Sequence, residues 1–315
     1  MRALCPVKAW RVFVGLLLFG TFSAQAAPVL YATGVGTGPG AGLSALYTVN
    51  PDTGASILLW NFSGIHIYAG GLAYDASTDS LYATGVEDSS TGTSRLFSIS
   101  RFTGAVTTVG AVGDNINLSS GGLAINPVTG VMYATGGNGF QSTGLFTIDK
   151  TSGIATLIGQ SGGQYPQPLV HLNGLGFRSD GVLFANGLYN YAASSLSNLL
   201  SVDLVTGVAT DIGPHGVTLG RQLAYSGLAF RDDGTLLSLG SLDAASGALY
   251  AVDTLTGAAT SLSGMGLPYG TGPIHFGVDG GLTFAPATAV PAPATLWLLG
   301  SGVLGLIGAA RKRMR

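Results

Sequence analysis

The sequence predicts an all-β protein built from repeats of about 50 residues, each with four short strands. Composition is the first reason: 51 of the 315 residues are glycine, only 9% are charged, and 46% are hydrophobic. Glu87 is the chain's one glutamate, whereas soluble helices usually carry Glu and Lys at exposed positions. The composition therefore favours strands over helices and is too apolar for a disordered chain.

Recurring phrases are the second reason. A Gly-Leu phrase ending in a large apolar residue begins at Gly71, Gly122, Gly174, Gly227 and Gly281. A second phrase occupies residues 31–34, 82–85, 133–136, 184–187 and 237–240. A third begins at Leu46, Leu96, Leu145, Leu200 and Leu249, and it precedes a Gly-containing turn and a short strand rich in Thr and apolar residues. Each repeat thus predicts four strands in a fixed order.

The connections predict antiparallel hairpins. Residues 126–130 and 231–234 separate the first and second strands, and residues 50–54 and 203–207 separate the third and fourth. Asp and Asn side chains bind turn backbone, and Gly adopts positive φ without strain. Four antiparallel strands at this period are typical of a β-propeller blade.

The order of the phrases predicts how the ring closes. The N-terminal part begins with a second strand at Tyr31 and lacks a first strand, while residues 281–284 form a first strand without followers. Pairing the two completes a fifth blade and leaves no unpaired edge there. The alternatives are another radial arrangement of the same units, or an open β-solenoid, which needs no such extra strand.

Residues 1–26 have the order of a secretory signal peptide. A basic start precedes an apolar core at residues 12–22, and Ala24 and Ala26 form an A-x-A cleavage pattern before Ala27. An N-terminal membrane anchor is the alternative, disfavoured by the short core. Cys5 is the only cysteine, so the mature chain, expected to start at Ala27, has no disulfide.

The C-terminal end has three parts after a body expected to span residues 27–286. Residues 287–293 form a Pro/Ala linker, residues 294–310 an uncharged run, and residues 311–315 a basic end. Seventeen helical residues span roughly 25 Å, near the lower limit for crossing a bilayer. We therefore expect a transmembrane helix with its basic end in the cytoplasm.

This tail resembles the PEP-CTERM sorting signal. The resemblance rests on the elbow, the apolar helix and the basic end, with the motif residues Val290, Pro291, Ala292, Pro293, Arg311, Lys312 and Arg313. The chain departs from the usual Pro-Glu-Pro by having Ala292. The resemblance implies export by a Gram-negative bacterium that makes exopolysaccharide and processing by an exosortase, a membrane-embedded transpeptidase-like enzyme. A plain one-pass anchor, which would hold the body in the periplasm, is the alternative.

The charges of the body speak against nucleic-acid binding. It carries six of the 13 basic residues and all 15 acidic ones, a net of about −9 by formal count. Nucleic-acid sites need basic patches that displace counterions. The acidic body is compatible with cations or neutral sugars.

Few residues suggest a catalytic or metal-binding role. His66, His171, His215 and His275 are expected in the connections between blades, but they occupy unequal positions in the repeat, so we predict no metal site and no cofactor. Asp149, Asp203 and Asp253 recur in the repeat and are expected to be structural. The acidic residues that break the repeat are Asp114, Asp211, Asp243 and Asp279, and they are candidates for catalysis only by elimination.

We therefore expect no catalytic site. Tyr189 and Tyr191, in a long loop, could stack on sugars or pack on neighbours, and Trp60 is expected to pack. The sequence favours a non-enzymatic binding or scaffold protein of the cell surface or extracellular matrix, with exopolysaccharide or matrix proteins as candidate partners. A propeller-fold glycoside hydrolase or lyase is the alternative.

Overall fold

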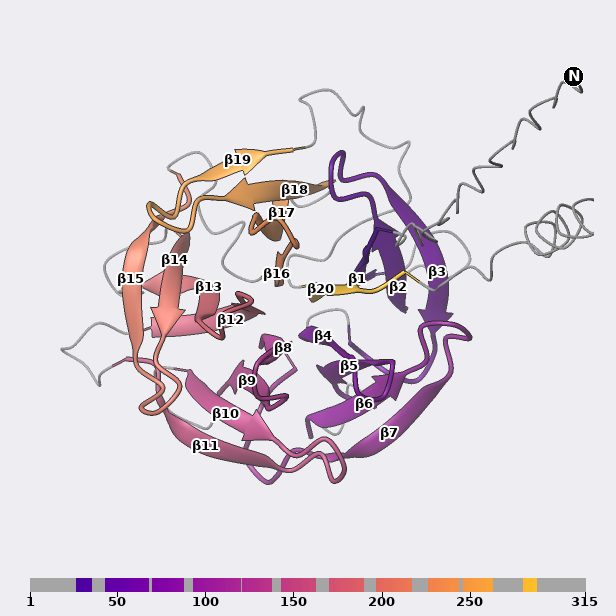
Figure 1. Cartoon of the computed structure of the whole chain (residues 1–315). Coiled ribbons are helices and arrows are strands. Elements are labelled where there is room, and N and C mark those ends of the chain that lie inside the picture. Colours follow the sequence, from indigo (N-terminus) through magenta and orange to yellow (C-terminus); the bar gives the residue numbers. More distant parts are fainter. Residues whose placement is uncertain are drawn as a thin grey trace, which may run out of the picture. The chain divides into compact units, whose positions relative to one another are not determined.

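The computed structural model describes residues 27–35, 43–67, 70–87, 93–119, 121–137, 143–162, 170–189, 197–216, 226–243, 246–262 and 280–287. These residues form twenty strands in five four-stranded antiparallel sheets arranged around an axis (Figure 1). The five-bladed propeller predicted from the repeats is confirmed. An open solenoid is excluded, because the sheets form a ring.

Each sheet is one blade, with its first strand innermost. Blade 1 contains β20 (Leu282–Ala285), β1 (Val29–Val35), β2 (Ser44–Val49) and β3 (Ser56–Phe62). Blade 2 contains β4 (Leu72–Asp75), β5 (Ser80–Gly85), β6 (Arg95–Ile99) and β7 (Val106–Ala111). Blade 3 contains β8 (Leu123–Ile125), β9 (Met132–Gly136), β10 (Gly144–Ile148) and β11 (Ala155–Gln160). Blade 4 contains β12 (Val170–Phe177), β13 (Leu183–Tyr189), β14 (Ser197–Val202) and β15 (Ala209–Pro214). Blade 5 contains β16 (Leu228–Phe230), β17 (Leu236–Asp243), β18 (Ser246–Val252) and β19 (Ala259–Ser261).

The predicted closure of the ring is present in blade 1. Strand β20 pairs antiparallel with β1, with Val29 opposite Ala285 and Ala32 opposite Leu282. The Gly281 amide also donates to Thr33 Oγ1 at 2.8 Å. The two ends of the propeller therefore meet at one edge of one blade, and β1 has no free edge on that side.

The turns form as the repeat predicts. The glycines that close the third–fourth strand turns have φ between 68° and 81°, a region that favours glycine, and they are Gly54, Gly104, Gly153, Gly207 and Gly257. In three of these turns an aspartate caps the backbone; Asp203 Oδ1, for example, accepts from the Val205 and Thr206 amides at 2.9 and 2.7 Å. The predicted structural role of Asp149, Asp203 and Asp253 is confirmed.

The hydrophobic core lies between the blades. One buried cluster joins Tyr133 and Leu145 of blade 3 to Leu175 and Phe177 of blade 4, and the Tyr133 and Phe177 rings lie 5.4 Å apart, centroid to centroid. Comparable clusters join blades 1 and 2, 2 and 3, 4 and 5, and 5 and 1. Each blade therefore depends on both neighbours for the burial of its faces.

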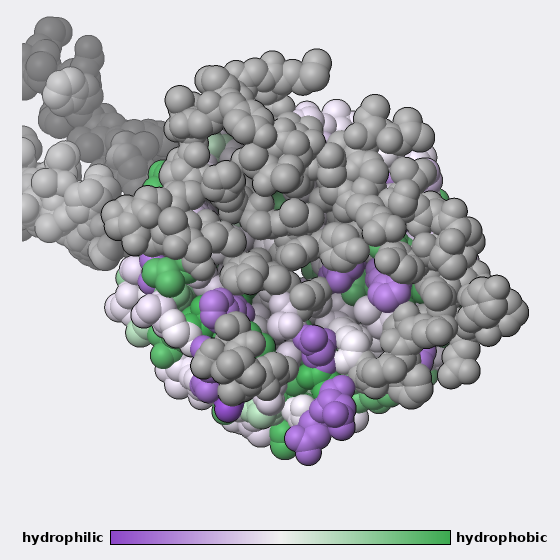
Figure 2. All heavy atoms as spheres, turned by 180° about the vertical axis from the view of Figure 1, so that it is seen from behind, coloured by the Kyte–Doolittle hydropathy of each residue, from purple (hydrophilic) through white to green (hydrophobic). Residues whose placement is uncertain are grey.

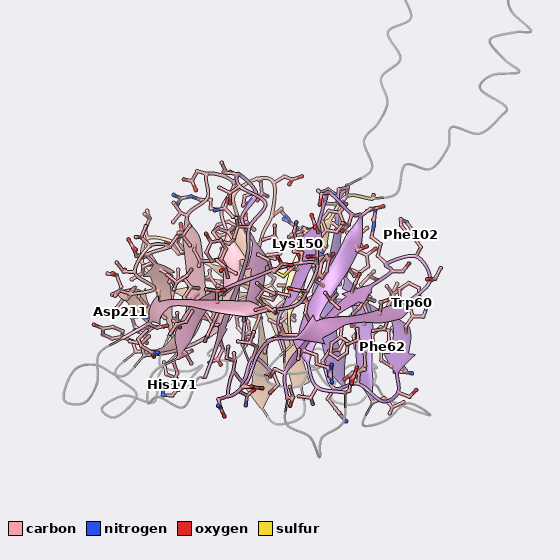
Figure 3. All side chains as sticks on the ribbon, turned by 90° about the horizontal axis from the view of Figure 1, so that it is seen from below. Trp60, Phe62, Phe102, Lys150, His171 and Asp211 are labelled. Atoms are coloured by element: carbon pink, nitrogen blue, oxygen red, sulfur yellow. The ribbon has the colours of Figure 1, made fainter. Side chains whose placement is uncertain are left out.

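The propeller has two different ends. We call the end that carries the first–second and third–fourth strand turns the turn face, and the opposite end the loop face. Figure 3 shows Lys150 and Phe102 toward the turn face and His171 toward the loop face. Seen from behind in Figure 2, the described residues mix hydrophilic and hydrophobic side chains.

The predicted signal peptide, residues 1–26, and the predicted transmembrane helix, residues 294–310, lie outside the described residues. In the part of the chain that the structure describes, no helix has the length and apolarity needed to cross a membrane.

Candidate functional site

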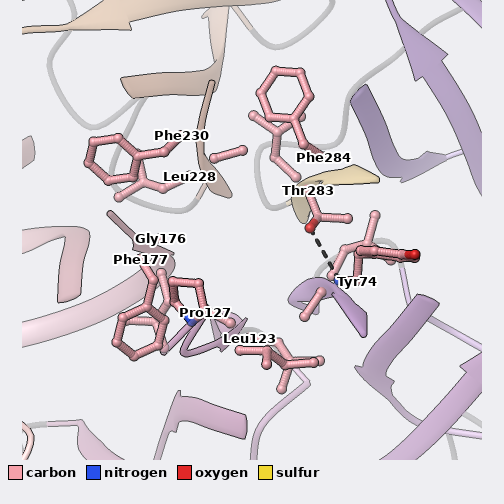
Figure 4. A pocket seen from close by; sticks show the side chains of 16 residues that line it. Tyr74, Leu123, Pro127, Gly176, Phe177, Leu228, Phe230, Thr283 and Phe284 are labelled. Carbon is pink, nitrogen blue, oxygen red and sulfur yellow. Dashed lines mark hydrogen bonds between the residues drawn. The ribbon is translucent and has the colours of Figure 1, made fainter. Parts of the chain in front are cut away.

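A hollow lies on the propeller axis at the turn face (Figure 4). Its volume is about 170 Å³. Every blade contributes the last large residue of the Gly-Leu phrase to the wall, namely Tyr74, Ile125, Phe177, Phe230 and Phe284. We call this the axial hollow; four of these five residues are aromatic, and the rings of Phe177, Phe230 and Phe284 point away from the axis toward the clusters between the blades (Figure 4).

A ring of glycines brings these residues together. A Cβ atom at Gly71 would lie 2.0 Å from the Leu123 amide nitrogen, and one at Gly122 would lie 2.0 Å from the Asn173 carbonyl oxygen. Equivalent collisions occur at Gly174, Gly227 and Gly281. Because no side chain separates them at these glycines, the five inner strands approach one another closely around the axis.

The wall of blade 2 is the polar side of the axial hollow. The Tyr74 hydroxyl donates to Asp79 Oδ1 at 2.8 Å, and the Arg101 guanidinium lies 5.5 Å from the Tyr74 ring centroid. Burial, and then the hydrogen bond to Asp79, raise the pKa of Tyr74 to about 12. Tyr74 therefore stays protonated at neutral pH and cannot serve as a general base there.

Arg101 also neutralises Asp79. The guanidinium Nη2 lies 2.7 Å and Nε 2.8 Å from Asp79 Oδ1. Nearby, Lys150 Nζ lies 2.7 Å from Asp75 Oδ2; burial alone would raise the pKa of Asp75, but Lys150 and Ser77 lower it overall. Asp75 and Asp79, the described carboxylates beside the axial hollow, are thus both paired with cations.

The histidines do not form a site. His66 lies in a connection between blades, where it pairs with Val86, and His275 lies outside the described residues. The predicted position of His171 in a connection is wrong: it belongs to β12, which begins one residue earlier and contains a bulge between Leu172 and Leu175. The described residues include no group of three His, Cys, Asp or Glu able to hold a metal ion.

His215 is buried between blades 4 and 5. Its Nδ1 lies 2.8 Å from the Gly257 carbonyl oxygen; because this oxygen and the Asn186 side-chain oxygen are both acceptors, a neutral ring can donate to only one of them. Its Nε2 lies 2.9 Å from the side-chain oxygen of Asn186, whose amide nitrogen donates to Ser238 Oγ at 2.7 Å. Burial lowers the pKa of His215 to about 4. Asn186 stands at the repeat position that Thr33, Thr84 and Thr135 occupy in blades 1 to 3.

The candidate acidic residues are not brought together either. Asp114 is exposed in the connection after β7, and Asp211, on the outer strand of blade 4, accepts from Asn198 Nδ2 at 2.8 Å. They lie on different blades. The side chain of Asp243 and all of Asp279 lie outside the described residues.

The predicted aromatic candidates take different roles. Tyr189 is half-buried at the end of β13 and packs on a core cluster, while Tyr191 lies outside the described residues. Trp60 packs as predicted: a Cβ atom on Gly104 of blade 2 would lie 2.5 Å from its Cγ. The axial hollow was not predicted, although the large residue at the end of every Gly-Leu phrase marks it in the sequence.

The sorting motif residues Val290, Pro291, Ala292, Pro293, Arg311, Lys312 and Arg313 lie outside the described residues, as do Ala24 and Ala26. Ala27, the expected first residue after cleavage, is the first described residue and is exposed. Their roles stay predictions.

Similar solved structures show likeness of fold. TolB from Acinetobacter baumannii is 15% identical with a TM-score of 0.45, over 80% of this chain and 54% of that one. An exo-β-1,3-galactanase from Clostridium thermocellum is 15% identical with a TM-score of 0.47, over 62% of this chain and 48% of that one. A GH43 glycoside hydrolase is 12% identical with a TM-score of 0.47, over 85% of this chain and 56% of that one. This chain spans about half the length of each, and at these values the likeness carries no argument about activity.

Comparison with family models identifies the tail. Residues 289–313 match the model of the PEP-CTERM protein-sorting motif, while a search of curated proteins found no match. The match confirms the resemblance seen in the sequence and implies processing by an exosortase-type enzyme. The chain thus carries a PEP-CTERM sorting motif behind a five-bladed propeller, which implies a protein exported across the membrane of a Gram-negative bacterium.

Proposed function

We propose that the exported propeller is a non-enzymatic binding or scaffold protein of the cell surface or extracellular matrix, and that it binds saccharide through the axial hollow. The observation that carries the proposal is the axial hollow itself: each of the five blades places a large side chain beside it, four of them aromatic, and in the described part of the chain the neighbouring carboxylates Asp75 and Asp79 are both paired with cations. Aromatic side chains offer large apolar contact area at low entropic cost, and the accessible parts of the half-buried Tyr74, Phe230 and Phe284 can contact a sugar ring.

The charges of the turn face narrow the class of saccharide. Its turns carry four basic side chains, Arg101, Lys150, Arg178 and Arg231, against nine aspartates. The nine are Asp52, Asp75, Asp79, Asp149, Asp180, Asp203, Asp232, Asp233 and Asp253. A net of −5 by formal count repels polyanions at low ionic strength. A neutral exopolysaccharide therefore fits the turn face better than a uronate-rich one.

The first experiment establishes where the protein ends up. The full chain is expressed in its host with and without the exosortase, the cells are fractionated, and the mature protein is weighed. We expect a chain that begins at Ala27 and loses its tail near residues 291–293 only when the exosortase is present. A chain that keeps Arg315 and stays in the inner membrane in both hosts would contradict the surface or matrix assignment.

The second experiment tests the axial hollow. Protein released by the host is titrated with the host's neutral exopolysaccharide, and Phe230→Ala is compared with Phe102→Ala. Phe230 lines the hollow, whereas Phe102 is a turn-face aromatic outside it with 53% of its surface exposed. We expect at least about tenfold weaker binding for Phe230→Ala, since loss of one anchoring aromatic commonly costs more than about 1.4 kcal/mol, and little change for Phe102→Ala. Equal losses, or shortening of the polysaccharide during incubation, would overturn the proposed binding role.

A further inference from the structure

Blade 1 lacks a connection that the other four blades have. In blades 2 to 5 a short turn joins the first strand to the second, as at Asn126–Gly130, where the Gly130 amide donates to the Asn126 carbonyl. In blade 1 the first strand, β20, belongs to the C-terminal end and the second, β1, to the N-terminal end. The register, with Val29 opposite Ala285, places the start of β1 and the end of β20 where that turn would be.

Arg101 reaches across to this gap from blade 2. It begins the turn between β6 and β7, and its Nη1 donates to the Pro286 carbonyl oxygen at 2.6 Å. Pro286 directly follows β20. A side chain of one blade thus holds the backbone of its neighbour, one residue beyond the last residue paired in the closing strand.

The guanidinium is held in place by three further groups. Its Nε and Nη2 both contact Asp79 Oδ1, which also accepts from the Tyr74 hydroxyl. The guanidinium carbon lies 5.5 Å and 4.6 Å from the Tyr74 and Phe102 ring centroids. Only 5% of the Arg101 side chain is exposed, so an uncompensated charge there would be costly.

The chemistry of this contact requires arginine. A planar guanidinium can face a carboxylate through one edge and still offer another N–H to a carbonyl, whereas an ammonium is a single point charge. The equivalent residue in blade 3, Lys150, makes an ion pair with Asp75 at the end of β4. Lys150 thus bonds the carboxylate of Asp75 in blade 2. Arg101 bonds a main-chain carbonyl in blade 1, one residue beyond the equivalent position, Ala285.

The geometry points to Arg101 as a clamp on the closing strand: with Asp79 and Tyr74 it takes the place of the missing turn, keeps β20 in register, and makes Pro286 the fixed exit from which the sorting tail leaves the propeller. This inference rests on the proposed function only in treating the residues after Pro286 as a sorting tail. Because the clamp is tested by local protection, its failure is distinct from a failure of sorting or of saccharide binding.

Hydrogen exchange in the full chain tests the clamp. Arg101→Ala is compared with Arg178→Ala, which removes an arginine that also pairs with a turn aspartate and also lies 5.5 Å from an aromatic centroid, but in blade 4. We expect the amides of Leu282–Ala285 to exchange at least about tenfold faster in Arg101→Ala and as in the wild type in Arg178→Ala, with β8 and β12 unchanged in both. Tenfold corresponds to about 1.4 kcal/mol of local opening free energy.

Two conservative variants keep the test decisive if Arg101→Ala fails to fold. Arg101→Lys keeps the positive charge but removes the several N–H groups of the planar guanidinium. Asp79→Asn removes the negative charge but keeps the side-chain shape, and Asn tolerates the φ of 52° that Asp79 has. Both should raise exchange in β20 more than elsewhere, by a smaller factor than Arg101→Ala. Unchanged exchange in β20, or an equal rise in all five inner strands, would overturn the clamp.

Discussion

Blade 1 and blade 3 contain the same four strands in the same order, yet they are held together differently. In blade 3 a covalent turn with an Asn126 cap and Gly130 at positive φ joins β8 to β9. In blade 1 the corresponding strands come from the two ends of the propeller; ladder hydrogen bonds and Thr33 join them, and Arg101 bonds the end of β20 to blade 2. Side-chain contacts between blades thus replace a covalent connection where the ring closes.

Removing the closing strand should have the largest effect. A chain ended at Gly280 loses β20, so it exposes the β1 edge and leaves Leu30 and Ala32 without Leu282, with which they cluster. We expect the free energy of unfolding to fall by more than about 5 kcal/mol, since this change removes buried side chains and a strand ladder together. Chemical denaturation followed by circular dichroism measures the loss.

The matched control for that truncation is a chain ended at Ala287, which keeps β20 and Pro286. It should retain the stability of the longer chain. Equal midpoints for the two truncated chains would show that β20 does not close the ring.

Substitutions in the glycine ring should have the next largest effect on the free energy of unfolding. The effect should differ between blade 3, whose inner strand is joined to the next by a turn, and blade 1, whose inner strand is not. Gly122→Ala drives a Cβ to 2.0 Å from the Asn173 carbonyl, between two covalently continuous blades; Gly281→Ala drives one to 2.3 Å from the Leu72 amide nitrogen. We expect a loss of about 3 kcal/mol for Gly122→Ala, and a smaller loss for Gly281→Ala because no turn joins β20 to β1. Gly137→Ala, which meets no atom within 4 Å, is the control and should be near neutral in thermal unfolding.

The sequence predicts what each blade repeats, because strands in equal positions need equal patterns. The phrases beginning at Gly71 and Gly122 predict five inner strands, and the extra phrase at Gly281 predicts closure, all of which the structure confirms. Features made once are not visible in a repeat. Arg101 aligns with Pro51, Lys150, Leu204 and Thr254, so no pattern marks it, and its partner Pro286 is 185 residues away.

The structural environments of His171 and His215 could not be predicted from the sequence repeat. His171 was predicted in a connection because β12 extends beyond the repeat pattern through a bulge. His215 does lie in a connection, but its hydrogen-bond partners are Gly257 in the next blade and Asn186 in β13, both far from it in sequence.

Acid should destabilise the packing between blades 4 and 5 through protonation of His215. Its folded pKa is lowered to about 4 by burial, against about 6.5 when unfolded, so the unfolded chain takes up the proton first as pH falls. The stability that this histidine contributes is complete above pH 6.5 and is lost progressively toward pH 4, by about 3 kcal/mol. Unfolding free energies of the wild type and His215→Asn at pH 7, 5.5 and 4.5 measure this, and parallel pH profiles would contradict it.

The smallest effects should come from the ion pairs that bridge blades at the turn face, and their ranking should follow burial. Lys150 pairs with Asp75, whose side chain is only 5% exposed, across the seam between blades 2 and 3. Arg231 pairs with Asp52, whose side chain is 73% exposed, across the seam between blades 5 and 1. Lys150→Met leaves a buried carboxylate without its cation and should cost about 2 kcal/mol. Arg231→Met should cost about 0.5 kcal/mol or less, because water screens that pair.

The pH dependence of the Lys150 variant distinguishes charge pairing from packing. In the wild type, Lys150 and Ser77 keep the pKa of Asp75 below its usual value, so its contribution to stability is present above about pH 4 and is lost as pH falls through the folded pKa. Without Lys150, burial should raise that pKa, so the variant should lose least relative to the wild type in acid and most at neutral pH. A deficit that is constant with pH would mean that Lys150 stabilises the seam through its aliphatic stem. The bridge between blades 2 and 3 would then differ in kind from the clamp on blade 1, where the charge of Arg101 acts on a carbonyl.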